Sequence, residues 1–283
     1  MEGFMEMAQA KVIFVLPLLF AGCVACAQTY TWTQVPMDGS RVGATIPTAE
    51  NVREALGSVE NGVYTAPNGR TYTGMVADVA SIMLEAQQEM APVKEYLGYA
   101  SEDMICTYPE SALSNMLADC IKSSAEEVFG RKVDVSMINF GGIRVDLYKG
   151  NIIMDDIMSM LPFKNYLCYV ALKGSDLRAM FEKMASTRVQ VFGGVRLTIK
   201  DRKLEEVLIG GEPLDDERVY GLATVDFLLN GGDDIFAARN ARELIISEVL
   251  VRDTVLPYIR SLTAQGKPVC YSIDGRVKII KGE

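Results

Sequence analysis

The chain has 283 residues, a formal net charge of −9 and an apolar content of 49%, and it contains no histidine. This length allows one large or two small domains, and the apolar content is enough for a sizeable core, so the chain is not expected to be disordered. The negative charge argues against a nucleic-acid binder, because affinity for a phosphate backbone needs clustered Lys and Arg side chains. A single nucleotide is still an allowed ligand, since a few well-placed groups suffice to bind one.

The lack of histidine restricts the chemistry of the chain. A two-metal phosphatase normally uses imidazole as metal ligand and as general acid, and Ser–His and Cys–His nucleophile pairs need it as well. The acidic pairs Asp155-Asp156 and Asp233-Asp234 leave a carboxylate site for magnesium or calcium open. We expect no catalytic residue, no metal site and no cofactor in this chain, and we predict that it does not hydrolyse phosphate unaided.

The N-terminal region is predicted to be an export signal. Residues 12–22 form an apolar run behind Lys11 that is too short to span a bilayer and suits the core of a signal peptide. Leu19-Phe-Ala-Gly-Cys23 approximates a lipobox, which predicts a lipoprotein signal over residues 1–22 and a lipid on Cys23. Cleavage after Ala27 is the alternative, with a signal peptide over residues 1–27. Either way we expect an exported protein, periplasmic or held in the cell envelope by its lipid anchor alone.

The rest of the chain divides into an arm and a domain. Residues 28–72 are polar and rich in turn residues, and they are predicted to be an N-terminal arm with a few short strands. Residues 73–283 are predicted to form one domain, which begins with a helix over residues 75–95 whose Met-rich apolar stripe we expect to fill a core. A second helix starts near residues 109–115 and presents one apolar face, made of Leu113, Met116, Leu117, Cys120 and Ile121.

The second half of the chain mixes strands with helices. Apolar patterns predict strands over residues 133–138, 166–172, 190–199, 204–209, 219–225 and 277–280. They predict helices from Ser175 onward and over Glu243–Leu262. Because the order is not a regular strand–helix alternation, it favours an α/β (α+β) sandwich over a doubly wound sheet.

Four cysteines follow the export signal: Cys106, Cys120, Cys168 and Cys270. Their spacings are unlike those of a zinc site. Cys120 lies on the apolar helix face and Cys168 in an apolar strand, which predicts buried thiols. Because the chain is expected to be exported, one disulfide is allowed among these four cysteines, and the sequence does not show which two would form it.

The run from Val133 to Arg144 contains the first candidate for a ligand-binding edge. A buried strand ends there in Asn139 and Phe140, and Gly141-Gly142 give the backbone freedom where an arginine approaches another group closely. The same residues also fit a strand followed by a tight turn with a solvated arginine.

Four segments, in this order and spacing, resemble the 5'-nucleotidase C-terminal domain. They are Asn139-Phe-Gly-Gly-Ile-Arg144, Pro162-Phe-Lys-Asn165, Leu172-Lys-Gly-Ser-Asp-Leu177 and Asp226-Phe-Leu-Leu-Asn-Gly-Gly-Asp233. The resemblance reaches from about Glu110 to the C-terminus. It is closest to free-standing, Bacteroides-like lipoprotein or periplasmic forms that lack the metallophosphoesterase domain. The resemblance implies a layered α/β/β/α sandwich.

The resemblance also implies a substrate-binding set. Two phenylalanines of the family sandwich the base, the Asp of the Asn-Gly-Gly-Asp turn holds ribose hydroxyls, and an Asn and an Arg contact the base or the ribose-phosphate side. An Asn and an Asp at the start of a helix help to place the substrate, and they match Asn115 and Asp119. The predicted set is Asn115, Asn139, Arg144, Phe163, Phe227, Asn230, Gly231, Gly232 and Asp233.

Two positions depart from the family pattern. Full-length nucleotidases carry an arginine that reaches the ribose or phosphate where this chain has Pro109, which puts tight phosphate binding in doubt. A glycine of the family is Phe140 here, which is expected to narrow the approach to the site.

Together these observations predict the nucleotide- or nucleoside-recognising half of a split 5'-nucleotidase, inactive alone. It would act in nucleotide catabolism or salvage in the cell envelope, while a separate metallophosphoesterase chain supplies divalent metals and nucleophilic water. Two alternatives stay open: a module that captures nucleosides without an enzymatic partner, and an envelope scaffold whose pocket has decayed.

Overall fold

The structure is a computed structural model that describes residues 50–281. The predicted export signal, Cys23 and the first part of the predicted arm lie outside the described residues. Among the residues that are described, no helix is long and apolar enough to cross a membrane.

Residues 50–90 form a small three-stranded sheet with helices. Its strands pair antiparallel in chain order, so that Ser58 faces Thr65 and Val63 faces Thr73. The short strands expected in this region are confirmed. Its elements are α1 (Val52–Leu56), β1 (Ser58–Glu60), β2 (Val63–Thr65), β3 (Thr71–Thr73) and α2 (Met75–Glu89). A short 3-10 helix, η2 (Ala91–Lys94), follows.

The Met-rich stripe of α2 is exposed. Met75 is 81% exposed and Ile82 is 68% exposed, while Ala77 and Gln87 are the buried residues of this helix. The expectation that the stripe fills a core was wrong. Periodicity shows that a helix has an apolar face, but not that another element covers it.

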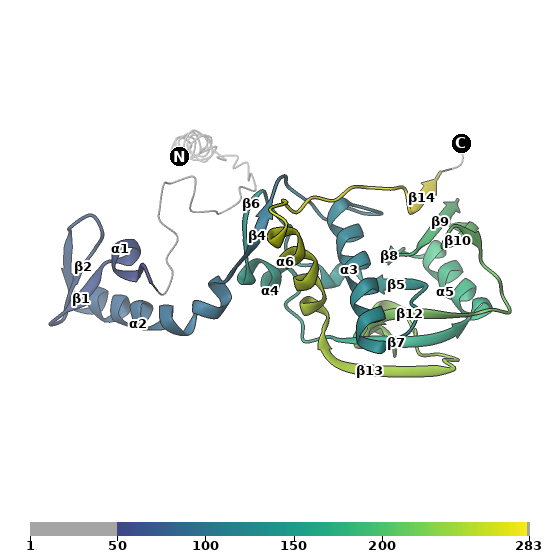
Figure 1. The fold of residues 1–283 in the computed structure, drawn as a ribbon, viewed down its shortest axis with the longest axis horizontal. Coiled ribbons are helices and arrows are strands. Elements are labelled where there is room, and N and C mark those ends of the chain that lie inside the picture. Colours follow the sequence, from purple (N-terminus) through teal and green to yellow (C-terminus); the bar gives the residue numbers. More distant parts are fainter. Residues whose placement is uncertain (1–49, 282–283) are drawn as a thin grey trace, which may run out of the picture. The chain divides into compact units, whose positions relative to one another are not determined.

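Nine of the remaining strands within residues 50–281 build two larger sheets (Figure 1). The five-stranded sheet has the order β13 (Glu243–Leu250), β7 (Tyr166–Lys173), β12 (Val219–Val225), β5 (Val135–Ile138) and β8 (Val191–Gly193). Within it β12 and β5 run parallel, and the other neighbours pair antiparallel. β5, β7 and β12 are almost entirely buried, which explains why they are apolar runs rather than alternating ones.

The four-stranded sheet has the order β11 (Glu212–Pro213), β10 (Lys203–Ile209), β9 (Val195–Lys200) and β14 (Val277–Ile280). β9 buries Val195, Leu197 and Ile199 and turns the residues between them outward, so one face of this sheet is core. β14 joins β9 in parallel, with Val277 opposite Leu197. A separate antiparallel pair is formed by β4 (Tyr96–Ala100) and β6 (Gly150–Ile153).

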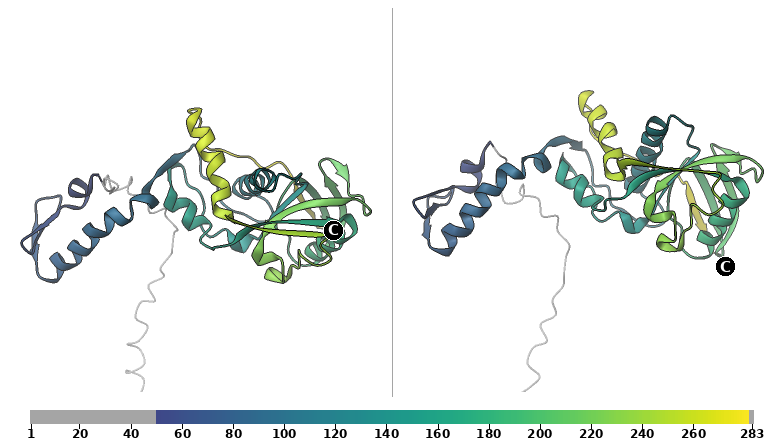
Figure 2. Two further views of the ribbon diagram at one scale, coloured as in Figure 1. Left: turned by 60° about the horizontal axis from the view of Figure 1, so that its bottom comes forward. Right: turned by 90° about the horizontal axis from the view of Figure 1, so that it is seen from below.

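Helices pack on these sheets. α3 (Ala112–Phe129) contacts β5 and β8, and α5 (Gly174–Ser186) contacts β7 and β10. α4 (Met154–Met160) follows β6. α6 (Leu256–Ala264), reached through η6 (Val251–Val255), lies beside α3 in all three views (Figures 1 and 2). The apolar face predicted for α3 is buried, and the mixed α/β class expected from the sequence is confirmed.

One predicted helix was wrong. Glu243–Leu262 is not continuous: Glu243–Leu250 is the edge strand β13, paired with β7, and only the part from Leu256 is α-helical. A short apolar run with β-branched residues fits a strand as well as a helix, and pairing with β7 decides between them.

All four cysteines of the described range are free thiols. The predicted burial of Cys120 and Cys168 is confirmed. Burial raises the pKa of the Cys120 thiol to about 12, so this group is a neutral thiol at physiological pH.

Candidate functional site

The carboxyl ends of β5 and β12 meet at one edge of the five-stranded sheet. The two strands are parallel neighbours, with Val135 opposite Leu222, so the chain leaves both of them on the same side. Ligands of α/β sheets bind in the crevice outside such strand ends. Asn139 follows β5 directly, and η4 (Asp226–Leu228) follows β12.

Asn139 and Asp233 touch at this edge. The Asn139 Nδ2 atom donates a hydrogen bond to Asp233 Oδ2 at 2.8 Å. Asn139 is buried and Asp233 is exposed, so the buried amide holds an accessible carboxylate in place. The Asn139 Oδ1 atom is buried without a hydrogen-bond partner among the described residues, an uncommon and costly state for a polar group.

The Gly-Gly pair after Phe140 makes room for the Asn139 side chain. A Cβ atom on Gly142 would lie 2.9 Å from Asn139 Oδ1, and one on Gly141 would lie 3.3 Å from Asn139 Nδ2. The two glycines therefore allow the backbone to pack closely against the side-chain amide of Asn139. Gln190 fixes the same turn, because its Oε1 atom accepts a hydrogen bond from the Phe140 N–H at 2.9 Å.

The Asn-Gly-Gly-Asp turn positions Asp233 and Phe227 together. Asp233 lies in the left-handed region, at φ 50° and ψ 32°, and Gly231 has φ 111°. A Cβ atom on Gly232 would lie 2.7 Å from carbons of the Phe227 ring, so only glycine lets the turn lie against that ring. The turn and the phenylalanine thus form one unit. Asn230, in the same turn, is exposed.

The two predicted base-stacking rings are open to solvent. Phe163 is 47% exposed and Phe227 is 46% exposed, and within residues 50–281 neither ring packs on another aromatic ring. The loop that carries Phe163 starts beside Arg144, whose backbone N–H donates to the Met160 carbonyl at 2.9 Å. The Arg144 guanidinium is exposed, and its hydrogen bond to the Gly141 carbonyl is long, at 3.4 Å. Exposed aromatic rings and an exposed guanidinium suit a flat, anionic ligand.

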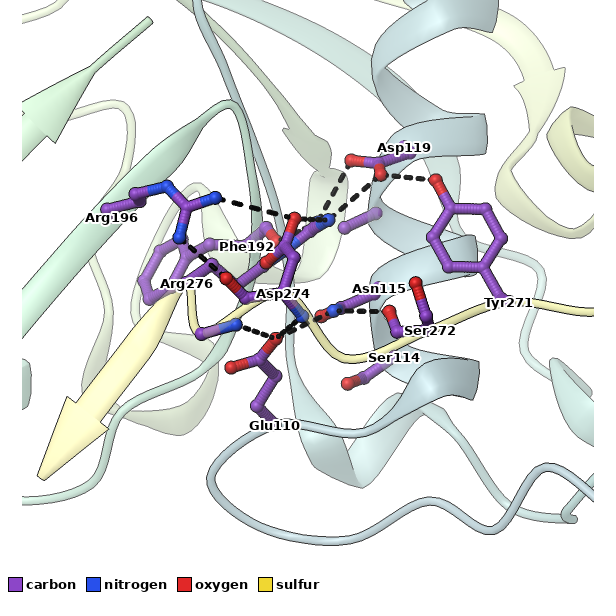
Figure 3. Close-up of polar contacts among 12 residues, drawn as sticks. Glu110, Ser114, Asn115, Asp119, Phe192, Arg196, Tyr271, Ser272, Asp274 and Arg276 are labelled. Atoms are coloured by element: carbon purple, nitrogen blue, oxygen red, sulfur yellow. Dashed lines mark hydrogen bonds and ion pairs between the residues drawn. The ribbon is translucent and has the colours of Figure 1, made fainter. Parts of the chain in front are cut away.

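Asn115 belongs to a different hydrogen-bond network (Figure 3). Its side chain is buried, and Nδ2 donates to Glu110 Oε1 at 2.8 Å and to the Ser272 carbonyl at 3.1 Å. Glu110 also accepts from the backbone N–H groups of Asp274 and Gly275, at 3.0 and 3.1 Å. The structure gives Asn115 a structural role, and contact with substrate stays a prediction.

Asp119 completes this network. Its carboxylate accepts hydrogen bonds from both terminal nitrogens of Arg276, each at 3.0 Å, and one from the Tyr271 hydroxyl (Figure 3). Arg276 is buried and donates as well to the Phe192 carbonyl at 2.9 Å. Burial and the bond to Asp119 raise the pKa of Tyr271. No pattern in the sequence pointed to Arg276, since a single arginine in a polar segment does not reveal a partner 157 positions away.

A cavity of about 170 Å³ adjoins Asp233. It lies between α5 and the segment from Asp233 to Asn240, and Arg188 and Arg239 are among the residues that line it. Sequence reasoning missed both arginines, because no motif marks them.

Among residues 50–281, no group of three or more carboxylate or thiol side chains is arranged to hold a metal ion.

Comparisons with known proteins identify the family. The family model of the 5'-nucleotidase, C-terminal domain matches residues 91–239, which is more than half of the chain. The chain therefore belongs to the 5'-nucleotidase C-terminal domain family.

Two curated relatives show how much of a longer protein the chain matches. The cell wall protein Lmo0130 of Listeria monocytogenes is 29% identical over 235 residues, covering 73% of this chain and 30% of that protein. The protein UshA of Yersinia enterocolitica is 32% identical over 105 residues, covering 35% of this chain and 19% of that protein. The chain thus spans less than a third of the length of these relatives.

Solved structures share the fold. The 5'-nucleotidase precursor from Thermus thermophilus matches with a TM-score of 0.64 at 23% identity, over 78% of this chain and 46% of that one. The NAD nucleotidase NadN of Haemophilus influenzae matches with a TM-score of 0.54 at 15% identity, over 78% of this chain and 48% of that one. The fold expected from the resemblance is confirmed.

Proposed function

We propose that this chain recognises the base and ribose of a nucleotide, as one half of a 5'-nucleotidase whose metal-dependent phosphatase is a separate chain. The observation that carries the proposal is the contact between Asn139 and Asp233 beside the exposed ring of Phe227. A buried amide that holds an accessible carboxylate in a left-handed turn costs stability, which is typical of a binding site.

The chemistry of the site suits a nucleoside. Asp233 uses one carboxylate oxygen for Asn139, which leaves Oδ1 to accept hydrogen bonds from ribose hydroxyls. Phe163 and Phe227 offer open ring faces, and stacking of a base on an aromatic side chain contributes roughly 1 to 3 kcal/mol. The guanidinium of Arg144 presents a planar fork that fits a phosphate.

The phosphatase half is assigned to another chain because this sequence has no histidine. Divalent metals and the nucleophilic water would be supplied there, and the nucleotide would bridge the two chains. Such a division predicts modest affinity for the ligand alone and hydrolysis only in the presence of the partner.

A place in the cell envelope is part of the proposal. It is supported by the apolar run over residues 12–22, by Cys23 in its lipobox-like setting, and by the relative described as a cell wall protein. Labelling of the full-length chain with a fatty-acid analogue tests the anchor, and a Cys23→Ala variant that stays equally labelled would exclude it.

Calorimetric titration of the chain with adenosine and AMP, without added metal, tests recognition. We expect micromolar to millimolar binding, lost in a Phe163→Ala/Phe227→Ala double variant. Absence of binding to both ligands would contradict the proposal, and equal binding by the double variant would mean that this site is not used. Full phosphatase activity of the purified chain with divalent metal would instead refute the division of labour.

A further inference from the structure

We infer that the cavity beside Asp233 is an anion subsite, in which Arg188 and Arg239 bind a phosphate group of the nucleotide. This inference rests on the proposed function and adds two residues to it, which would favour phosphorylated nucleosides over nucleosides. Neither arginine belongs to the segments that resemble the family.

The cavity shares Asp233 with the proposed nucleoside site. Asp233, which we assign to ribose, lines it together with Arg188, Phe236 and Arg239. Its volume of about 170 Å³ is ample for a phosphate group, since about 10–15 Å³ on this measure holds one water molecule. A group attached to the ribose therefore has a place to enter.

The cavity is lined by three carboxylates, Asp176, Asp233 and Asp234, and by three cationic side chains, Lys183, Arg188 and Arg239. Lys183 is paired with Asp234, and Asp176 accepts a hydrogen bond from Asn240 at 2.8 Å. Asp233 is engaged by Asn139.

The two arginines stand apart from this pairing. Within the described part of the chain no carboxylate forms an ion pair with Arg188 or Arg239. Asp176 and Asp233 also form no ion pair within residues 50–281 and balance the formal charge of the lining, so an anion would be bound by the N–H donors of the two guanidinium groups and not by a net positive field.

Aromatic rings hold both arginines in place without consuming their donors. The guanidinium carbon of Arg188 lies 5.4 Å from the ring centre of Tyr108 and 5.8 Å from that of Phe140. The guanidinium carbon of Arg239 lies 4.5 Å from the ring centre of Phe236. Stacking on a ring face fixes the plane of a guanidinium and leaves its N–H groups, which lie in that plane, free for the two oxygens of a phosphate.

Arg188 is also tied to the nucleoside site through Phe140. Phe140 follows Asn139 directly, and its ring packs on Tyr108 with centres 5.6 Å apart. The cluster of Tyr108, Phe140 and Arg188 thus connects the amide that holds Asp233 with a cationic wall of the cavity. A phosphorylated ribose would contact both parts at once.

The test compares adenosine, 5'-AMP and 3'-AMP by calorimetric titration of the chain without added metal. For the unmodified chain we expect at least one of the two phosphorylated ligands to bind about tenfold more tightly than adenosine, the effect of one or two charge-assisted hydrogen bonds. In an Arg188→Gln/Arg239→Gln variant this preference should fall to the part that Arg144 contributes, while adenosine binds as before. An Arg131→Gln variant is the matched control, because Arg131 stacks on Tyr169 but is not part of the cavity.

Two results would overturn the subsite: phosphorylated ligands that bind no more tightly than adenosine, or a preference of the same size in the double variant and in the unmodified chain. If adenosine, 5'-AMP and 3'-AMP all fail to bind, the proposed function fails. Calorimetric titration with inorganic phosphate then tests the subsite alone. Phosphate binding that the double variant loses would support the subsite, and no phosphate binding would refute it. All of the substituted arginines are exposed, and thermal unfolding of each variant verifies that the fold is kept.

Discussion

The Asn139 Nδ2 atom and the Asp233 Oδ2 atom lie 2.8 Å apart although 94 positions separate the two residues. This hydrogen bond orients the carboxylate that we assign to ribose. An Asn139→Ala variant should therefore bind adenosine about tenfold more weakly, because Asp233 loses its donor. Binding of the free base adenine should not change, and calorimetry with both ligands measures the difference. Equal losses for adenosine and adenine would contradict this role.

Stacking on Phe227 should contribute to binding of any base. A Phe227→Ala variant is expected to lose roughly 1 to 3 kcal/mol of binding free energy for adenosine, and Phe227→Tyr should keep most of it. Tyr96→Ala is a matched control, since Tyr96 is 53% exposed and lies in β4, outside the site. A similar loss in the control would show that the effect is not stacking.

The pair of Asp119 and Arg276 should be important for stability rather than binding. An Arg276→Met variant leaves a partly buried carboxylate without its cationic partner and should lower the free energy of unfolding by about 3 kcal/mol. An Asp119→Leu/Arg276→Met double variant should be less destabilised than the single variant. Arg260→Ala is the control: its ion pair with Glu95 is exposed, so we expect a loss below about 1 kcal/mol. Urea unfolding measures all three.

Acid should weaken the same network. The hydrogen bond from Arg276 holds the pKa of Asp274 below its ordinary value of 3.8. A lowered folded-state pKa contributes stability that is fully present above about pH 3.8 and is lost as the pH falls through the folded-state pKa. An Asp274→Asn variant should therefore lose less stability than the unmodified chain between about pH 5 and about pH 3 in urea unfolding. Parallel losses in the two proteins would rule out a contribution from Asp274.

The exposed stripe of α2 should tolerate charge. Ile82 is 68% exposed, so Ile82→Lys should change the free energy of unfolding by no more than about 0.5 kcal/mol. Ala77, on the same helix, is 1% exposed, and Ala77→Lys should be clearly destabilising because it buries an unpaired charge. Circular dichroism during thermal unfolding distinguishes these outcomes. Strong destabilisation by Ile82→Lys would mean that the stripe is covered.

The sequence predicted the sheet more reliably than the surroundings of the site. Strands such as β7, β12 and β14 were placed correctly because buried runs and turn residues are local signals. β13 was assigned to a helix, since only pairing with β7 makes residues 243–250 a strand.

The site was predicted in part, for a related reason. Asn139 and Asp233 lie in recognisable segments, and the structure brings them into contact. Arg188 and Arg239 lie outside such segments, and only folding places them around one cavity. The chain has Pro109 where the resemblance leads one to expect an arginine. A guanidinium is nevertheless present next to this position, because Arg188 lies over the ring of the neighbouring Tyr108.

The link between the start of α3 and the segment around Arg276 has a consequence for biosynthesis. Asp119 meets Arg276 across 157 positions, and Glu110 accepts a hydrogen bond from the Val277 N–H across 167 positions. Until residue 277 has left the ribosome, Glu110, Asn115 and Asp119 lack the hydrogen-bond partners that residues 271–277 supply. Contacts of such high sequence separation form late and slowly. We expect this part of the nascent chain to remain open to chaperones and proteases until residues 276 and 277 are available to pair with Asp119 and Glu110.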